Sequence, residues 1–294
     1  MTSGVTLVTG SSGFVGRVVM ARLAAAGHCA IGLDPIAAPT TQIIDDLSDC
    51  ARLRALLHRE RVTHIIHAGG VSGPMVMADD PVGVLTINVT GSMNLLYAAM
   101  ECGVRTFVYC SSVAAIGDFY EERPIGEDYP MRPTSAYGCS KAAMDYVLRA
   151  LWRKVPLDIC SLRLTAVYGP GRQTEFNVDT IVRAAIAGGT ARIGPLSDWP
   201  YIYVDDAADA CIAACFSNAR KQLAYFVAHP ERVTPEDIAA ACAAAGRPVR
   251  LEIDSSKPKA SRGPVDVEAA ARDFGFRAQV GHHEGIRRMI AAAG

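Results

Sequence analysis

Short apolar runs alternate with longer helical patterns through the first half of this sequence. The apolar runs are VTLVTG, CAIGLD, THIIHAGG, TFVYCSS and DICSLRL, and segments between them, such as RVVMARLAAAG and ARLRALLHRE, repeat apolar residues at helical spacing. Strands that are apolar throughout must be covered on both faces, which is the environment of a parallel sheet between two layers of helices. The sequence therefore predicts a doubly wound α/β domain.

The rhythm changes after Arg163, where glycine and proline gather and helical segments are expected near 177–187, 205–216, 234–245 and 282–293. We expect a sheet domain over residues 1–165 and a smaller portion over residues 166–294 that mainly binds the substrate. The strand and helix near 200–216 are expected to return to the sheet domain. Gly27 and Gly103 each precede a strand and should end the helices before them.

The composition indicates a soluble protein that acts on a small molecule. Lysine and arginine number 29 against 30 acidic residues, so no charged surface is offered to a nucleic acid or an anionic membrane. No basic and apolar leader opens the sequence, and no run of about 18 apolar residues follows. The nine cysteines lack a paired C-x-x-C spacing, so we expect buried thiols in a reducing cytoplasm and no bound metal.

The stretch TGSSGFVG, directly after the first apolar run, has the spacing of a dinucleotide-binding turn. Gly10, Gly13 and Gly16 would let the backbone approach a pyrophosphate, whose charge would meet free N–H groups at a helix start. Asp34 stands 18 residues beyond Gly16, where it would bind both ribose hydroxyls and repel a 2′-phosphate. The pattern favours NAD over NADP, with Arg17 nearby as a reason to keep NADP open. A plain strand–turn–helix junction is the alternative.

Tyr137 and Lys141, in YGCSK, are four residues apart, so on a helix their side chains share one face. Tyrosine has a pKa of about 10, and lowering it by about 3 units requires roughly 4 kcal/mol, which a neighbouring ammonium and a nicotinamide cation could supply. The spacing alone also suits an ordinary helix. Ser111 and Ser112, at the end of a predicted strand upstream, favour the catalytic interpretation.

These motifs together resemble the extended short-chain dehydrogenases/reductases, also called the NAD-dependent epimerase/dehydratase family. TGSSGFVG is similar to the family's T-G-x-x-G-[FY]-[IV]-G, DDLSD to D-L-x-D, HAGG to H-x-A-[AG], NVTG to N-V-x-G-[ST], SSVAAIG to S-S-x-x-x-[YF]-G and YGCSK to Y-x-x-[ST]-K. LRLTAVYGPG and YIYVDDAADA are similar to later family segments. The resemblance covers about residues 1–215 by motif, and it implies an NAD-dependent enzyme with a Rossmann sheet.

The resemblance also implies roles for individual residues. Tyr137 would be the catalytic base or acid, and Lys141 would bind the nicotinamide ribose and lower the pKa of the tyrosine. Ser112 would hydrogen-bond the reacting oxygen, and it is preferred over Ser111 because it stands five residues before Gly117. The implied cofactor-binding residues are Gly10, Ser12, Gly13, Phe14, Val15, Asp34, Asp46, Leu47, Ala68, Gly69, Gly70, Asn88, Ser111, Tyr137, Lys141 and Val167, with Asn88 mostly structural. The candidate substrate residues are Ser72, Ser112, Arg172 and Trp199.

Other polar residues are interpreted structurally. His64 and His67 flank an apolar strand, and no carboxylate or cysteine shares their spacing as a metal site would require. Asp205 and Asp206 could form a carboxylate pair for acid–base chemistry. The resemblance implies instead that they cap a helix and tie the C-terminal part to the sheet.

Two departures from the family pattern bear on the substrate. Members that act on nucleotide sugars usually have an asparagine where this chain has Ala166 and an arginine where it has Trp199, and both bind the diphosphate. Arg172 and Arg192 remain as cations for a single carboxylate or phosphate. We therefore expect an oxidoreductase that transfers a hydride between NAD and a hydroxyl-bearing sugar, sugar acid or similar small substrate. The alternatives are a nucleotide-sugar epimerase or dehydratase with tightly bound NAD, and a catalytically silent NAD sensor.

The helix that follows Tyr137 has apolar stripes on two faces, of which the sheet can cover one. The stripes are Met144, Leu148 and Trp152 on one side and Val147 and Leu151 on the other. The helix near 90–102 would be a suitable neighbour through Met93, Leu96 and Met100. The sequence predicts a homodimer with a four-helix interface, as in related families.

Overall fold

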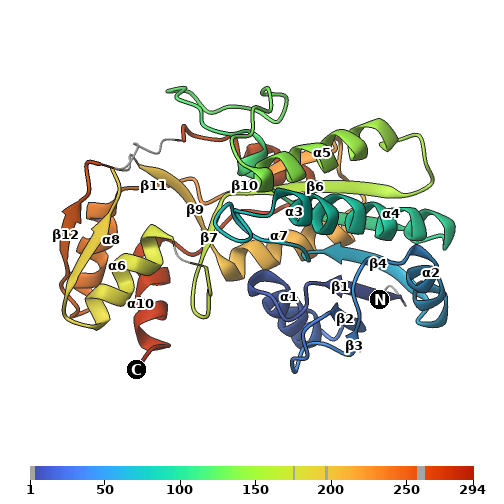
Figure 1. Ribbon diagram of the computed structural model, residues 1–294, viewed down its shortest axis with the longest axis horizontal. Helices are drawn as coiled ribbons and strands as arrows, with labels where there is room; N and C mark the ends of the chain where they lie inside the picture. Colours follow the sequence, from blue (N-terminus) through green and yellow to red (C-terminus); the bar gives the residue numbers. More distant parts are fainter. Residues whose placement is uncertain (1–3, 175, 196–197, 257–261) are drawn as a thin grey trace.

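The centre of the protein is a seven-stranded parallel sheet with the strand order β10-β6-β5-β4-β1-β2-β3 (Figure 1). The computed structural model describes residues 4–174, 176–195, 198–256 and 262–294. The strands are β1 (Val5–Thr9), β2 (Ala30–Asp34), β3 (Ile43–Ile44), β4 (Val62–His67), β5 (Thr106–Ser112), β6 (Asp158–Leu164) and β10 (Ala224–Val227). The predicted doubly wound α/β fold is confirmed. The strand order reverses between β1 and β4, which is where such sheets bind ligands.

Helices cover both faces of the sheet, and each face has its own apolar core. One face carries α1 (Phe14–Ala25), α7 (Val204–Phe216) and α9 (Glu268–Phe274), and the other carries α2 (Cys50–Arg59), α4 (Ser92–Glu101) and α5 (Ala136–Leu151) (Figure 1). Leu23 and Cys211 are buried in the first core, and Leu53, Leu96 and Leu148 in the second. Each buried leucine contributes about 2 kcal/mol by leaving water. These two cores hold the carboxyl ends of the strands in fixed positions.

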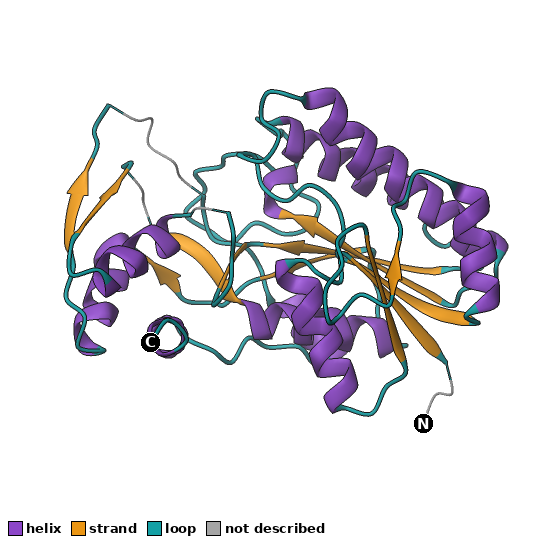
Figure 2. Cartoon of the chain, turned by 60° about the horizontal axis from the view of Figure 1, so that its bottom comes forward, coloured by secondary structure: helices purple, strands orange, loops and turns teal. Residues whose placement is uncertain are grey.

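A lobe of helices and short strands lies beside the main sheet (Figure 2), and segments from the C-terminal half of the chain form it (Figure 1). It holds a three-stranded sheet of β7 (Ala166–Tyr168), β9 (Trp199–Tyr203) and β11 (Arg232–Val233), and a two-stranded sheet of β8 (Thr190–Ile193) and β12 (Arg250–Ile253). The lobe's helices are α6 (Asn177–Ile186), α8 (Pro235–Ala244) and α10 (His282–Ala291). From this half, α7 returns to pack against α1, and β10 joins the main sheet beside β6. The strand expected near 200 to return with α7 is β9, which pairs within the lobe instead.

The helices lie where the apolar periodicity of the sequence predicts them, apart from one short helix. Gly27 and Gly103, which follow α1 and α4, have φ angles of 74° and 67°, a conformation that a Cβ atom disfavours. The four predicted later helices correspond to α6, α7, α8 and α10. The sequence did not indicate α9, because seven residues are too few for a periodic pattern to stand out.

A continuous helical stretch from Pro81 to Glu101 consists of α3 (Pro81–Leu85), the π-helix η1 (Thr86–Gly91) and α4. Among the residues that the structure describes, it is the one stretch long and apolar enough to cross a membrane. Packing accounts for this apolar character, because Leu95 and Leu96 lie in the core of the sheet domain. The buried Asn88 in η1 also suits a position inside the protein.

The segment between β5 and α5 pairs with residues close to the C-terminal end of the chain. It begins with a short 3-10 helix, η2 (Val113–Ala115). Phe119 forms a parallel bridge with Arg262, and Ile125 forms one with Val265. These bridges bring a segment from the last 35 residues of the sequence close to the carboxyl end of β5.

Candidate active site

The crevice outside the carboxyl ends of β1 and β4 is formed by closely packed glycines. Gly10 has a φ of 70°, and a Cβ atom on it would lie 2.6 Å from the backbone of Gly69. A Cβ atom on Gly16 would lie 2.1 Å from the Gly10 carbonyl oxygen. Gly13 caps α1 without a side-chain hydrogen bond, and the first turn holds no acidic residue. The helix start is therefore free to bind an anion, which fits the pyrophosphate of a dinucleotide.

Asp34 ends β2 at the same edge of the sheet. Its carboxylate accepts hydrogen bonds from the backbone N–H of Ser12 at 3.2 Å and from that of Ile36 at 2.9 Å. Arg17, which had kept NADP open, is engaged elsewhere: its guanidinium lies 5.5 Å from the centre of the Phe14 ring and donates to the carbonyl of Pro170. The charge that faces a ribose at this position is therefore the carboxylate of Asp34.

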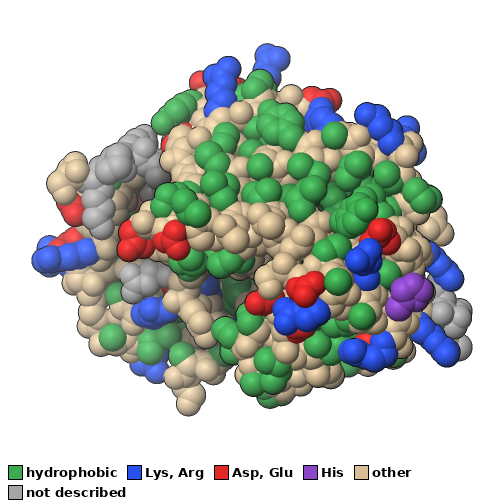
Figure 3. Space-filling view, turned by 45° about the vertical axis from the view of Figure 1, so that its right-hand side comes forward, with side chains coloured by type: hydrophobic (Ala, Val, Ile, Leu, Met, Phe, Trp, Pro, Cys, Tyr) green, Lys and Arg blue, Asp and Glu red, His purple; other side chains and the backbone are tan. Residues whose placement is uncertain are grey.

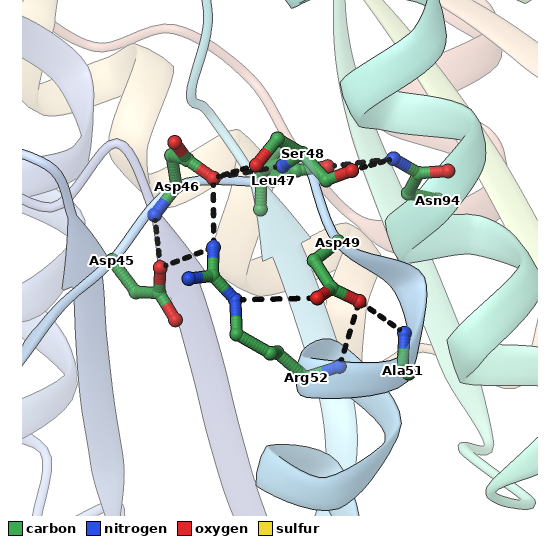
Figure 4. A network of polar contacts seen from close by, with 8 residues as sticks. All are labelled: Asp45, Asp46, Leu47, Ser48, Asp49, Ala51, Arg52 and Asn94. Carbon is green, nitrogen blue, oxygen red and sulfur yellow. Dashed lines mark hydrogen bonds and ion pairs between the residues drawn. The ribbon is translucent and has the colours of Figure 1, made fainter.

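Polar contacts also hold the segment between β3 and α2 (Figure 4). Arg52 pairs with Asp46 at 3.2 Å, and the Asn94 side chain from α4 donates to the carbonyl groups of Leu47 and Ser48 at 2.9 and 3.0 Å. Hydrogen bonds from Ser48 hold the pKa of Asp46 below its usual value. Asp46 and Leu47 are thus fixed beside β2, next to the edge where the adenine of a dinucleotide is predicted.

The loop after β4, Ala68–Gly70, is held by Asn88 from η1. The Asn88 side chain accepts a hydrogen bond from the Val71 N–H at 2.7 Å and donates to the Val71 carbonyl at 3.1 Å and the Ser140 hydroxyl at 2.9 Å. A Cβ atom on Gly70, whose φ is 121°, would lie 2.5 Å from Asn88 Oδ1. Asn88 thus links the loop after β4 to α5.

The remaining predicted residues lie at different depths around the crevice. Val15 packs against the core under α1, and the Val167 carbonyl in β7 accepts a hydrogen bond from Arg172. Ser72 is exposed in the loop after β4. Arg192 lies on β8 with 82% of its side chain exposed and pairs with Glu252 at 2.8 Å. The suggestion that Arg192 meets the substrate is therefore wrong.

Tyr137 and Ser112 meet where β5 and α5 come together. The Ser135 hydroxyl caps α5 by accepting the Gly138 N–H at 3.1 Å, which sets Tyr137 in the first turn. The Ser112 hydroxyl accepts the Ala114 N–H at 3.1 Å, and Ser112 acts to lower the pKa of the Tyr137 phenol. Ser111 is buried, and its hydroxyl has no hydrogen-bond partner among the described residues. The structure thus brings Ser112, and not Ser111, to the phenol.

Lys141 lies one helical turn beyond Tyr137, on the same face of α5. Its ammonium is 5.8 Å from the centre of the Tyr137 ring and donates to the Cys110 carbonyl at 2.8 Å. The residue is 6% exposed, and burial lowers the pKa of Lys141 to about 8, against the opposing effect of Cys110 and Asp145. The side chain is therefore charged below a pH of about 8.

The Tyr137 phenol is not a ready base in the protein alone. Burial raises the pKa of Tyr137 above its usual value, while the hydrogen bond from Ser112 and the positive charges of Arg262 and Arg172 oppose that rise. The sequence argument relied on Lys141 together with a nicotinamide cation to lower this pKa. The protein's own groups leave the pKa of the phenol above its usual value.

Arg172 and Trp199, both candidate substrate residues, come together around Phe176. The Arg172 guanidinium lies 5.2 Å from the centre of the Phe176 ring, whose edge packs on Trp199 at 5.9 Å between ring centres. Arg172 also donates to the carbonyl and hydroxyl of Thr174, both at 3.0 Å. Trp199 is 7% exposed, and its indole N–H has no hydrogen-bond partner among the described residues. The two side chains thus both pack on Phe176, and the positive charge of Arg172 acts on the Tyr137 phenol.

Sequence reasoning missed Arg262. Its guanidinium lies 5.2 Å from the centre of the Trp199 ring, and its buried Nε has no hydrogen-bond partner among the described residues. Its backbone is fixed by the bridge to Phe119 and by a 2.8 Å hydrogen bond from Arg232 to its carbonyl. A single arginine in an aperiodic segment carries no signal for such a role. Only the long-range pairing of this segment reveals that its charge reaches Tyr137.

The other polar residues set apart in the sequence are structural. His67 lies between the hydroxyls of Thr9 and Ser92, at 2.6 and 2.7 Å, and burial lowers the pKa of His67 to about 3. The Asp206 carboxylate accepts the backbone N–H groups of residues 279 and 280, which ties the C-terminal part to α7. In the described parts of the chain, no three His, Cys, Asp or Glu side chains are grouped to hold a metal ion.

Comparisons with known proteins identify the family and agree with the fold. The model of the NAD dependent epimerase/dehydratase family matches residues 6–228. A UDP-glucose 4-epimerase of Mycolicibacterium smegmatis is 29% identical over 304 residues, which cover 97% of each chain. The structure of Thermus thermophilus UDP-glucose 4-epimerase in complex with NAD is 27% identical, with a TM-score of 0.86 and 98% of each chain covered. A Thermotoga maritima UDP-glucose 4-epimerase with UDP-glucose shares the fold, with a TM-score of 0.88 at 21% identity and 98% coverage of each chain.

Proposed function

Because the chain belongs to the NAD-dependent epimerase/dehydratase family and is an enzyme of the extended short-chain dehydrogenase/reductase type, we propose that it acts on a nucleotide-linked sugar as an epimerase or dehydratase with tightly bound NAD. The bound NAD supplies the hydride acceptor and donor. Relatives that match almost the whole chain include UDP-glucose 4-epimerases, which supports this substrate class.

The observation that carries the proposal is the pair of arginines beside Tyr137. Arg172 and Arg262 both act on the phenol through their charge, and burial lowers the pKa of each guanidinium. Arg172 pairs with Asp179 at 3.7 Å, and Asp118 supports the charge of Arg262, whose Nε still has no hydrogen-bond partner among the described residues. A buried N–H of a cation that lacks an acceptor is costly. An anionic group of a substrate, such as a diphosphate, would relieve that cost next to the reacting hydroxyl.

This proposal revises the substrate expected from the sequence alone. The absence of the family's asparagine and arginine, at Ala166 and Trp199, had favoured a small sugar or sugar acid over a nucleotide sugar. Arg262 weakens that argument, because it brings a cation to the face of the very tryptophan that replaces the arginine. A dehydrogenase that releases NADH remains the second candidate, and Ala166 is the observation that favours it.

The proposed division of work at the reacting centre follows from the geometry. Tyr137 accepts the proton of the substrate hydroxyl and later returns it, while Ser112 hydrogen-bonds the same oxygen. Lys141 holds the ribose next to the nicotinamide and keeps a positive charge near the phenol. The substrate carbon is oxidised to a ketone in this arrangement, and reduction of that ketone on its other face would complete an epimerisation.

The proposed cofactor contacts use the crevice at β1 and β4. The pyrophosphate is bound at the start of α1 by Gly10, Ser12, Gly13, Phe14 and Val15, and the ribose by Asp34. Asp46 and Leu47 contact the adenine. Ala68, Gly69 and Gly70 line the cofactor with Ser111 and Val167. Closely packed glycines, an uncapped helix start and the carboxylate of Asp34 at one sheet edge support these assignments.

Two measurements test the substrate class. Calorimetry with UDP and UDP-glucose should give micromolar affinity, and incubation with UDP-sugars should give epimerised or dehydrated product by NMR without net NADH. Millimolar or weaker binding of both ligands, with NADH released from free sugars or sugar acids, would overturn the proposal in favour of the dehydrogenase.

A matched pair of variants distinguishes a specific role of Arg262 in binding the substrate's anionic group from a general effect of positive charge. Arg262→Met should lower UDP-glucose affinity by tenfold or more, because one charge-assisted contact of about 1.5–3 kcal/mol is lost. Arg192→Met removes an equal charge from an exposed position on β8 and should leave affinity unchanged. Equal losses in both variants would show that Arg262 has no specific role.

We also propose that the protein is a cytoplasmic homodimer. Large apolar side chains remain exposed on one region formed by α3, η1, α4 and α5 (Figure 3). They are Val82, Leu85, Ile87, Met93, Tyr97 and Tyr146. Leu96, which the sequence had suggested for the interface, is 1% exposed and lies in the core instead. An exposed apolar region of this kind supports association with a second copy.

A further inference from the structure

The Lys141 ammonium is buried between β5 and α5, so the surrounding groups must stabilise its charge. The charged or titratable groups that face it are Tyr109 and Cys110 from β5, His67 from β4, and Tyr137 and Asp145 from α5. A buried charge that lacks such support would lose its proton. The question is which of these groups keeps the lysine charged.

Cys110 and Asp145 raise the pKa of Lys141 against its burial, but both groups are also engaged elsewhere. Both oxygens of the Asp145 carboxylate are already used, one by Ser161 at 2.6 Å and the other by the buried Arg163 at 2.8 Å. His67 is neutral, since burial lowers its pKa to about 3. The Cys110 carbonyl accepts one of the three ammonium protons, at 2.8 Å, and leaves the charge otherwise unmatched.

The ring of Tyr109 is the closest remaining group. The Lys141 nitrogen lies 4.7 Å from the centre of this ring, against 5.8 Å for the ring of Tyr137. Tyr109 is fully buried in the core between the sheet and α5, and the face of an aromatic ring carries negative potential. Desolvated cation–π contacts are stronger than exposed ones, so this contact acts at full strength.

We propose that Tyr109 is a positioning residue: the face of its ring holds the Lys141 ammonium charged and within reach of Tyr137 and the cofactor ribose. The catalytic consequence rests on the proposed function, but the charge state of Lys141 can be measured without any turnover. The hydroxyl of Tyr109 is not needed for this role, since the ring face alone meets the ammonium.

The direct test is a titration of Lys141 in protein labelled with ¹³C at the lysine ε-carbons. The sequence contains five lysines, so the Lys141 signal can be assigned by its loss in Lys141→Met, and the other four serve as internal controls. Tyr109 is replaced first by phenylalanine and then by ring-fluorinated phenylalanines. Fluorine makes the electrostatic potential of the ring face less negative, while the shape of the ring is kept. We expect the Lys141 pKa to stay near its original value with phenylalanine and to fall stepwise with fluorination, by about one unit in all.

Conventional variants give a second line of evidence. Tyr109→Leu removes the ring and should lower the Lys141 pKa, so the basic limb of the rate profile moves to lower pH. Phe107→Leu is the packing control, because Phe107 is also fully buried on β5 in the same core and makes no described contact with Lys141. Phe107→Leu should lose stability to a similar degree and leave the Lys141 titration unchanged.

The outcomes separate the inference from the proposed function. An unchanged Lys141 pKa across the fluorinated series would overturn the role of Tyr109, even if Tyr109→Leu fails to fold. An equal shift in Phe107→Leu and Tyr109→Leu would do the same, since packing alone would then explain it. A stepwise fall in the pKa, in a protein that turns over no nucleotide sugar, would support the inference while the proposed function failed.

Discussion

Ser112, Tyr137 and Lys141 meet because three separate local features place them. Ser112 ends a buried strand, Tyr137 follows the helix cap made by Ser135, and Lys141 is one turn further on the same helix face. The contacts of the phenol and the ammonium with β5 are long-range, and they set the charge state of each group. The residue types therefore indicate the chemistry, whereas the protonation states come from packing.

Replacement of Tyr137 by phenylalanine removes the proposed acid–base group and keeps the ring. We expect turnover to fall by about 10²–10⁴-fold while NAD affinity changes only a few fold, because the phenol acts on the substrate. Steady-state rates and cofactor titration measure both. Tyr146→Phe changes an exposed tyrosine of the same helix and should leave both unchanged. A Tyr137→Phe enzyme with more than a tenth of the wild-type rate would exclude Tyr137 as the base.

Asp34 should set the preference for NAD. A 2′-phosphate beside this 6%-exposed carboxylate would bring like charges together where little water screens them, at a cost of several kcal/mol. Asp34→Asn should therefore raise NADP affinity relative to NAD by about tenfold or more, as measured by titration of both cofactors. Asp46→Asn, which changes an exposed acid in the same crevice, should leave the ratio unchanged. Wild-type protein that binds NADP as tightly as NAD would contradict the assignment.

Residue patterns predicted the local parts of the site better than the distant ones. Gly10, Asp34, Tyr137 and Lys141 stand at fixed short spacings from a strand or on a helix, so their relative placement follows from backbone periodicity. Arg262 reaches the site only because its segment bridges to Phe119, more than 140 residues earlier in the sequence. No local pattern encodes that pairing.

At the scale of elements, the π-helix η1 connects the cofactor crevice to α5. It carries Asn88, whose side chain makes three hydrogen bonds that join the loop after β4 to Ser140. Ser140 in turn donates to the carbonyl of Tyr137. One buried amide thus links the helix that carries Tyr137 to the loop after β4.

Replacement of Asn88 by alanine should test that connection. It leaves the buried N–H and carbonyl of Val71 without their partners, so we expect a loss of about 2–4 kcal/mol in the free energy of unfolding. NAD affinity should also fall, because the loop at Ala68–Gly70 loses its support. Urea denaturation and cofactor titration measure the two effects. Asn94→Ala, which removes a more exposed amide, serves as the control, and equal losses in both variants would argue against a special role for Asn88.

The long helices and buried strands were predictable, and the short strands of the lobe were not. Helices such as α5 and α6 repeat apolar residues over about three turns, and strands such as β5 are buried over nearly their whole length. The strands β8 and β12 have four residues each, and arginine or glutamate alternates with apolar residues in them. The two strands pair across more than 50 residues of sequence. Such strands are defined by their partner, because four residues carry too little pattern on their own.

At the scale of the whole molecule, the sheet domain and the lobe share the site unequally. The sheet domain contributes the crevice, Ser112, Tyr137 and Lys141, and the lobe contributes Trp199 and the arginines beside the phenol. Variation in the lobe can therefore change the substrate without change in the redox chemistry. This arrangement explains why the family is evident from the sequence while the substrate class depended on a lobe residue that the sequence did not indicate.

The last prediction concerns assembly through the exposed apolar region on α3, η1, α4 and α5. Tyr97 and Tyr146 are 52% and 56% exposed on α4 and α5. Burial of such apolar area against a second copy stabilises a dimer, because it removes the area from water. The wild-type protein should be a dimer by light scattering at micromolar concentration. Tyr97→Glu together with Tyr146→Glu would bury like charges at the interface and should give a folded monomer. Tyr120→Glu changes a tyrosine outside this region that is 71% exposed, and this variant should stay dimeric. A monomeric wild-type protein would refute the prediction.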